Sequence, residues 1–182
     1  MTFRQFLQTH NVYLDGGMGT LLQQAGLPAG TPPEAWSLSH PGQLTAIHAA
    51  YIEAGADVVL ANTFGVNAVK YENYEQLVAA AVAAAKAAVV QCGRGFVALD
   101  IGPLGRLLEP LGDLPFEQAV DIFAATVRAG VAAGADLIVI ETMTDEGELD
   151  DEQAELMQSA LAFGEVTAET VLTARVDMTA ID

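Results

Sequence analysis

A ten-residue stretch, residues 132–141, decides the fold of this chain; it reads AAGADLIVIE. The alanines end a helical pattern, Gly134 and Asp136 mark a turn, and the four apolar residues that follow are typical of a buried strand. Glu141 comes directly after that strand. The same phrase occurs earlier as EAGADVVL over residues 53–60. A helix that runs through a glycine turn into an apolar strand is one unit of a parallel α/β protein, and it is used here twice.

Two more apolar runs, residues 12–14 and 96–99, have the same design. Each of the four runs ends in a carboxylate or amide with small residues after it, in segments that read DGGMGT, NTFGVN, DIGPLG and ETMTD. Near-continuous apolar strands are typical of a parallel sheet covered by helices. In such proteins the carboxyl ends of the strands carry the functional site. We therefore expect one shared cleft at these four strand ends.

Helical patterns over residues 41–54, 72–90 and 116–133 separate the runs, which gives the order β-α-β-α-β-α-β. Two closures fit this order: an open doubly wound sheet and a (β/α)8 barrel. A whole barrel takes about 250 residues, so 182 residues predict a partial (β/α)8 TIM-type barrel of four to five βα units. Beyond residue 145 the pattern weakens. Residues 149–163 fit an amphipathic helix, and residues 170–178 fit either a strand or a short helix.

Composition limits the class of protein. The chain is 52% hydrophobic with a mean hydropathy of +0.33, which indicates a globular domain. Its net charge is −17 without a basic stripe, which excludes a nucleic-acid partner. No apolar stretch has the length and purity of a membrane span, and residues 1–10 lack the order of a signal peptide. Together with a single cysteine, these features predict a cytoplasmic protein without a membrane partner.

The polar residues at the strand ends suit recognition of a free amino acid. Asp15 and Glu141 offer carboxylates for an ammonium group, while Gly16 and Gly17 offer backbone N–H groups to a carboxylate. The same cleft would contain the side chains of Asn62, Thr63 and Asp100. Each motif also has a plainer interpretation, because Asn and Thr form local turns, an aspartate can cap a helix, and a glutamate can form a structural ion pair.

Together, the motifs at the four strand ends resemble the homocysteine S-methyltransferase family. They are LDGGMGT (14–20), AGAD with NTFG (54–57 and 62–65), DIGP (100–103) and IET (140–142). The resemblance covers about residues 8–146 and is nearest to the homocysteine-binding domain of the cobalamin-dependent members. It implies a (β/α)8 barrel that methylates the sulfur of homocysteine to give methionine. It also implies that Asp15 and Glu141 hold the amino group, with Gly16, Gly17, Asn62 and Thr63 around the carboxylate.

The resemblance implies zinc as well, held in the family by cysteine thiolates from the second half of the barrel. Those cysteine-bearing segments are absent from this sequence, and its one cysteine, Cys92, falls before a strand and not after one. We therefore assign no zinc ligand and no catalytic residue to the chain. The methyl donor stays open, because methylcobalamin, S-methylmethionine and betaine all serve relatives.

The expected organisation is a single truncated domain: family-like βα units over residues 1–146 and a diverged, acidic, helical tail over residues 147–182. Four or five units of a barrel leave open sheet edges. The leading hypothesis is a methyltransferase-type domain that binds homocysteine, with doubtful activity on its own. The alternatives are a non-catalytic half-barrel that assembles edge to edge into a homo-oligomer, or a fragment missing its C-terminal half. A different α/β enzyme, such as an aldolase or a phosphate-binding barrel, lacks its strand-end lysine or phosphate loop here.

Overall fold

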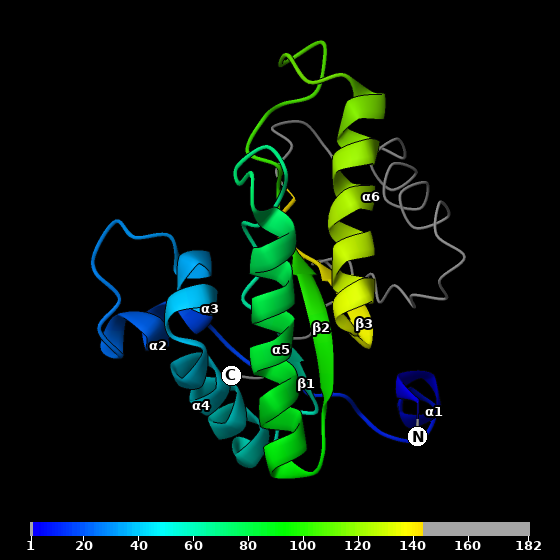
Figure 1. Cartoon of the computed structure of the whole chain (residues 1–182). Helices are drawn as coiled ribbons and strands as arrows, with labels where there is room; N and C mark the ends of the chain where they lie inside the picture. The colour runs from blue at the N-terminus through cyan, green and yellow to red at the C-terminus, as the bar shows by residue number, and fades with distance from the viewer. Residues whose placement is uncertain (1, 144–182) are drawn as a thin grey trace, which may run out of the picture.

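The computed structural model describes residues 2–143, which form a parallel sheet with helices packed along it (Figure 1). The elements follow the alternating order expected for an α/β protein. In chain order they are α1 (Phe3–Leu7), α2 (Met18–Gln24), η1 (Pro33–Ala35), α3 (Trp36–Ser39), α4 (Pro41–Ala54), β1 (Val58–Leu60), α5 (Tyr74–Cys92), β2 (Phe96–Ile101), α6 (Phe116–Ala133) and β3 (Leu137–Ile140).

The sheet has the order β1-β2-β3, and both pairings are parallel. The predicted strand at residues 12–14 is reduced to one parallel bridge between Leu14 and Val58. The ladder stops there because the next backbone donor on β1, the N–H of Leu60, bonds the side chain of Asp15 at 3.1 Å. A side-chain oxygen thus takes the place of a strand partner, and this same contact positions the carboxylate.

Glycine turns end the helices, as the repeated phrase predicted. Gly55 follows α4 with φ 120°, and Gly134 follows α6 with φ 89°. Both values lie in the region where a side chain is strained, so glycine is favoured at these two positions. The predicted bounds of α4 and α6 are confirmed. The third helix, α5, begins and ends two residues later than predicted, at Tyr74 and Cys92.

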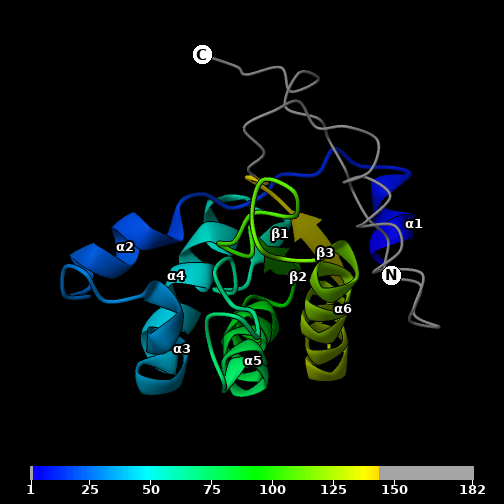
Figure 2. The same ribbon diagram turned by 90° about the horizontal axis from the view of Figure 1, so that it is seen from above.

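The helices that follow the glycine loop cover one face of the sheet, whereas α1 packs on the other. In the view from above, α3, α5 and α6 lie on the same side of the strands (Figure 2). Val59, Val97, Leu99 and Ile138 point to this side and join the main apolar core. Strands that pair in sequence order, with successive helices on one side, differ from an open doubly wound sheet, which carries helices on both sides. The described residues are compatible with a segment of a (β/α)8 barrel.

The other face of the sheet changes in character along its length. At its amino end, Phe3 of α1 packs against Val58, Ala98 and Leu137 in a separate apolar cluster. Because side chains alternate between the faces of a strand, the positions two residues after Ala98 and four after Leu137 share this face. These positions are Asp100 and Glu141, so the face is apolar at one end and acidic at the other.

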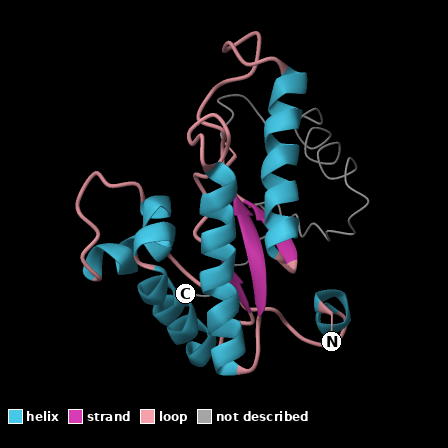
Figure 3. Ribbon diagram, viewed as in Figure 1, coloured by secondary structure: helices cyan, strands magenta, loops and turns pink. Residues whose placement is uncertain are grey.

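Long loops leave the carboxyl ends of β1 and β2, at residues 61–73 and 102–115 (Figure 3). They run above the acidic end of the sheet.

The helix between these two loops in the sequence, α5, is by length and composition apolar enough to cross a membrane. Its seven buried residues pack in the interior of the domain, and the helix contacts α4, α6 and β2. Its alanine-rich sequence is accounted for by this close packing. The helix predicted at 149–163, the segment at 170–178 and the tail at 147–182 lie outside the described residues.

Candidate functional site

Asp15 lies directly after the Leu14 bridge, at the carboxyl end of the sheet. This end, where Asp15, Asp100 and Glu141 lie, is the acidic mouth of the sheet. Its backbone N–H donates to the carbonyl of Val58 at 3.0 Å, and its Oδ2 accepts the N–H of Leu60 at 3.1 Å. The side chain is only 3% exposed. Burial raises the pKa of Asp15 to about 7; the bonded N–H of Leu60 opposes this rise and the charge of Glu141 adds to it. The carboxyl group is therefore poised between its two protonation states near neutral pH.

Asp100 occupies the neighbouring strand end. The hydroxyl of Thr63 clamps its backbone, because Thr63 Oγ1 donates to the carbonyl of Asp100 at 2.8 Å and accepts its N–H at 3.1 Å. The side chain is buried, and Oδ1 has no hydrogen-bond partner among the described residues. Burial, with smaller contributions from Glu141 and Asp15, raises the pKa of Asp100 to about 8. A buried, unpaired carboxyl oxygen is the position where a ligand donor is expected.

Glu141 follows β3, and its backbone N–H donates to the carbonyl of Ile101 at 3.1 Å. Its side chain is exposed. The next residue, Thr142, has a φ of 54°, which is strained for a β-branched side chain and marks a sharp turn at the mouth. Because the charge of Glu141 reaches both Asp15 and Asp100, all three carboxyl groups lie at the same end of the sheet.

No described lysine or arginine neutralises this acidic mouth through the ion pairs that the structure shows. Those pairs lie elsewhere and join Lys86 to Asp136, Arg94 to Asp57 and Arg106 to Asp113. The structural ion pair that sequence reasoning offered as the plainer role of Glu141 is thus not among them. Two buried carboxyl groups beside an exposed one, with no ion-paired cation among residues 2–143, favour binding of a positively charged ligand group.

The side chains of Asn62 and Thr63 are already engaged within the protein. Asn62 Nδ2 donates to the carbonyl of Pro33 at 2.8 Å and to Ser37 Oγ at 3.2 Å, so both amide hydrogens are used. The Thr63 hydroxyl is used in the clamp on Asp100. In this structure both residues brace the loop after β1 and its contact with η1 and α3.

The glycine loop lies against Tyr51 of α4. The Tyr51 hydroxyl donates to the carbonyl of Gly17 at 3.3 Å, and a Cβ on Gly16 would stand 3.1 Å from the same hydroxyl oxygen. Gly17, and not Asp15, is the N-cap of α2. The alternative role of Asp15 as a helix cap is therefore wrong, since its carboxylate bonds β1 instead.

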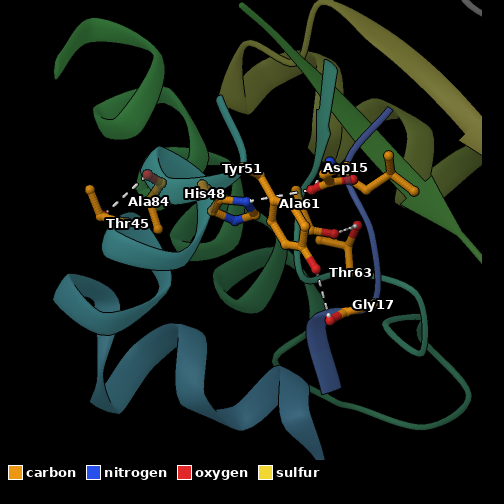
Figure 4. A network of polar contacts seen from close by, with 9 residues as sticks. Asp15, Gly17, Thr45, His48, Tyr51, Ala61, Thr63 and Ala84 are labelled. Atoms are coloured by element: carbon orange, nitrogen blue, oxygen red, sulfur yellow. Dashed lines mark hydrogen bonds and ion pairs between the residues drawn. The ribbon is translucent and has the colours of Figure 1, made fainter. Parts of the chain in front are cut away.

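His48 and Tyr51 also lie beside the Asp15–Gly17 segment, although the sequence motifs predicted no role in the site for either residue. Both lie on the apolar side of α4, three residues apart, which is typical of core residues. Figure 4 shows that both side chains point toward the Asp15–Gly17 segment. His48 is fully buried, its Nδ1 lies 3.9 Å from Asp15 Oδ2, and burial lowers its pKa to about 4. The ring is therefore neutral at pH 7, and this contact is not an ion pair there. The signal available in the sequence was the position of a histidine on the otherwise apolar face of the helix at residues 41–54.

The described residues do not fit a zinc site. Across residues 2–143, no group of three His, Cys, Asp or Glu side chains is placed to hold a metal ion. Cys92 ends α5, and its thiol contacts the carbonyl of Ala49 at 3.8 Å. That position is at the opposite end of the βα unit from the acidic mouth.

Residues 12–174 match the sequence model of the homocysteine S-methyltransferase family. The chain belongs to this family. The match covers the Asp15 loop and the ends of all three strands. It confirms the resemblance drawn from the four motifs.

The chain is similar in sequence to a methionine synthase and in structure to a homocysteine methyltransferase. Methionine synthase from Mycobacterium tuberculosis is 31% identical over 147 residues, covering 72% of this chain and 12% of the relative. The oxidized form of the homocysteine methyltransferase MmuM from Escherichia coli has a TM-score of 0.73 at 22% identity, covering 94% of this chain and 65% of that one. Its metallated form gives 0.70, also at 22% identity, covering 92% and 64%.

The identities and coverages support a shared fold but do not by themselves assign an activity to this chain. At 22% identity the MmuM structures establish a shared fold. The chain spans less than two thirds of MmuM and about an eighth of the methionine synthase.

Proposed function

We propose that this chain is the homocysteine-binding part of an S-methyltransferase that moves a methyl group to the sulfur of homocysteine and gives methionine. Family membership supports the reaction class. One observation supports the choice of ligand. Asp15, Asp100 and Glu141 gather at the carboxyl end of a parallel sheet, and the described lysine and arginine ion pairs lie elsewhere. A zwitterionic amino acid supplies the missing positive charge in the form of its ammonium group.

Within this proposal, Asp15 and Glu141 hold the ammonium group from two sides. The backbone N–H groups of Gly16 and Gly17 receive the carboxylate. Asn62 and Thr63 act as supports, because their donors are used inside the protein. An ammonium beside Asp15 favours its ionised form, so binding near pH 7 releases a proton from the protein.

The fold proposal follows from the same geometry. The Leu14 bridge and β1 to β3 are the first four strand positions of a (β/α)8 barrel, and the family match extends past them to residue 174. Residues 147–182 are an acidic continuation.

Zinc in this family makes the thiol of homocysteine a thiolate, which is the nucleophile. Residues 2–143 hold the proposed amino-acid pocket, and no group of three His, Cys, Asp or Glu side chains in them is placed to hold a metal ion. We therefore propose binding by this chain and assign methyl transfer to the completed enzyme. Methylcobalamin is one candidate donor, since the resemblance is nearest to the cobalamin-dependent members of the family.

Calorimetry with L-homocysteine and L-methionine tests the pocket. Glu141→Gln removes a charge from the mouth, and we expect a roughly tenfold loss of affinity, or about 1.4 kcal/mol. Asp113→Asn is the matched control, because Asp113 pairs with Arg106 away from the mouth; its affinity should stay unchanged. Equal effects of the two variants, or no binding by a chain that circular dichroism shows to be folded, would contradict the proposal.

A second candidate is edge-to-edge assembly of two chains. The first edge of the described sheet carries exposed apolar side chains, with Tyr13 63% and Leu14 51% exposed. Such an edge favours pairing with another strand. Light scattering should then show a dimer; a monomer at every concentration would contradict the assembly.

A further inference from the structure

His48 is the buried polar side chain for which the proposed binding mode gives no role. It lies in the middle of α4 with no exposed surface, and neither ring nitrogen has a hydrogen-bond partner among residues 2–143. Buried polar atoms in folded proteins are nearly always paired. An imidazole that is fully enclosed and unpaired is therefore expected to have a partner in some state of the site.

The nearest candidate partner is the Asp15 carboxylate. His48 Nδ1 lies 3.9 Å from Asp15 Oδ2, roughly 1 Å beyond an ordinary N–H···O distance. A small rotation of either side chain closes a gap of this size. Oδ2 already accepts the N–H of Leu60, and a carboxylate oxygen has room for a second donor.

Hydrogen bonds on both sides of His48 fix the position of α4 relative to its neighbours. One turn before it, Thr45 Oγ1 donates to the carbonyl of Ala84 on α5 at 3.1 Å. One turn after it, Tyr51 donates to the carbonyl of Gly17. Figure 4 shows the three side chains in a row along α4, with His48 in the middle and directed at Asp15. α4 is thus tied to the segment that forms the mouth.

We infer that His48 is a positioning residue for Asp15: its Nδ1–H donates a hydrogen bond to the ionised Asp15 carboxylate and holds that group toward the mouth. A neutral imidazole has one donor and one acceptor nitrogen, so it can supply this bond without adding a charge. Because a donor stabilises the ionised carboxylate, it counteracts the burial of Asp15. This role concerns Asp15 itself and stands whether or not the ligand is homocysteine.

Other titratable groups also face this pair in the described part of the chain. They are Tyr51 on α4, Asp100 at the end of β2 and Glu141 after β3. All three are neutral or negative, so each one disfavours the ionised form of Asp15 or leaves it unchanged. The groups in residues 2–143 that can favour it are the backbone N–H groups of Leu60 and of Asp15 itself, and the ring of His48.

Nitrogen-15 NMR of the histidine rings tests the inference on the unaltered chain. Above pH 7, where Asp15 ionises, we expect the proton of His48 on Nδ1 and a change in the Nδ1 shift that follows the titration of Asp15. A proton on Nε2 throughout, with shifts indifferent to Asp15, would overturn the inference.

Two substitutions make the test independent of the tautomer. His48→Leu removes the donor, and we expect the titration midpoint of Asp15, followed by its ¹³Cγ signal, to rise by at least half a pH unit. His48→Gln restores a donor and should return the midpoint toward the wild-type value. Thr45→Val is the control, since it loosens α4 without removing a group that faces Asp15.

The outcomes are distinct. The same midpoint in wild type, His48→Leu and His48→Gln would overturn the inference, as would an equal rise with Thr45→Val. If His48→Leu does not fold, the ring tautomer in the wild type decides. Loss of amino-acid binding in a chain with the expected Asp15 titration would contradict the proposed function alone.

Discussion

Replacing Asp100 with asparagine should make the protein more resistant to alkaline pH. Asp100 is 6% exposed, its Oδ1 is unpaired among the described residues, and its pKa is raised from 3.8 to about 8. The folded state therefore keeps a proton that the unfolded chain releases near pH 4. Between these two pKa values the free energy of unfolding falls as pH rises, by up to about 1.4 kcal/mol per pH unit.

The size of the stability change depends on how much of the pH range between the two pKa values is crossed. From pH 5 to pH 8 the ionisation of Asp100 lowers the free energy of unfolding by up to about 4 kcal/mol. Relaxation around the buried charge reduces the measured value to about 2–3 kcal/mol. Asparagine keeps the shape of the side chain, and the backbone clamp from Thr63 does not depend on the carboxylate. The stability advantage of Asp100→Asn over the wild type should thus grow by about 2–3 kcal/mol between pH 5 and pH 9.

Urea denaturation followed by circular dichroism at pH 5, 7 and 9 measures this difference. Asp113→Asn is the control, because hydrogen bonding to Arg106 lowers the pKa of Asp113 and its side chain is exposed. That control should show no gain in stability as the pH rises from 5 to 9. A difference between Asp100→Asn and wild type that stays constant over this range would refute a raised pKa at Asp100.

Two further predictions concern the support of the mouth and of the core. Gly65→Ala should lower the free energy of unfolding by about 1–3 kcal/mol, because its Cβ would collide with Oε1 of the buried Glu34, which bonds Tyr71. Gly17→Ala, where nothing lies within 4 Å, should change the thermal midpoint little, and equal losses would argue against the Glu34 contact. Leu99→Ala should cost about 2–5 kcal/mol, since Leu99 is fully buried between the sheet and α6. Val90→Ala, at a site 80% exposed, should stay within about 0.5 kcal/mol, and thermal melts of the two variants make the comparison.

Local patterns were sufficient to predict most elements of the described chain. The periodicity of residues 41–54 and 116–133 and the glycines after them predicted α4 and α6 with their observed bounds. Apolar runs predicted β1 and β3 in the same way. The first strand was overestimated, because an apolar run does not reveal that the Asp15 side chain will take the N–H of Leu60.

The site was predictable in its location and less so in its chemistry. That Asp15, Asp100 and Glu141 end apolar runs was enough to place them at one mouth, since the carboxyl ends of parallel strands share an edge. Asn62 donates to Pro33 and Ser37 and not into the mouth. This choice of partners depends on the path of η1 and α3. No spacing in the sequence encodes that path.

The amino-acid sequence by itself determined the alternation of helices and strands and the acidic character of the strand ends, because both follow from side chains close together along the chain. Only the three-dimensional packing places α3, α5 and α6 on one face of the sheet, raises the pKa values of Asp15 and Asp100 by burial, and turns His48 toward Asp15. These properties depend on distances between residues such as 15 and 48 or 100 and 141. Burial and electrostatic coupling arise only when packing brings such residues together.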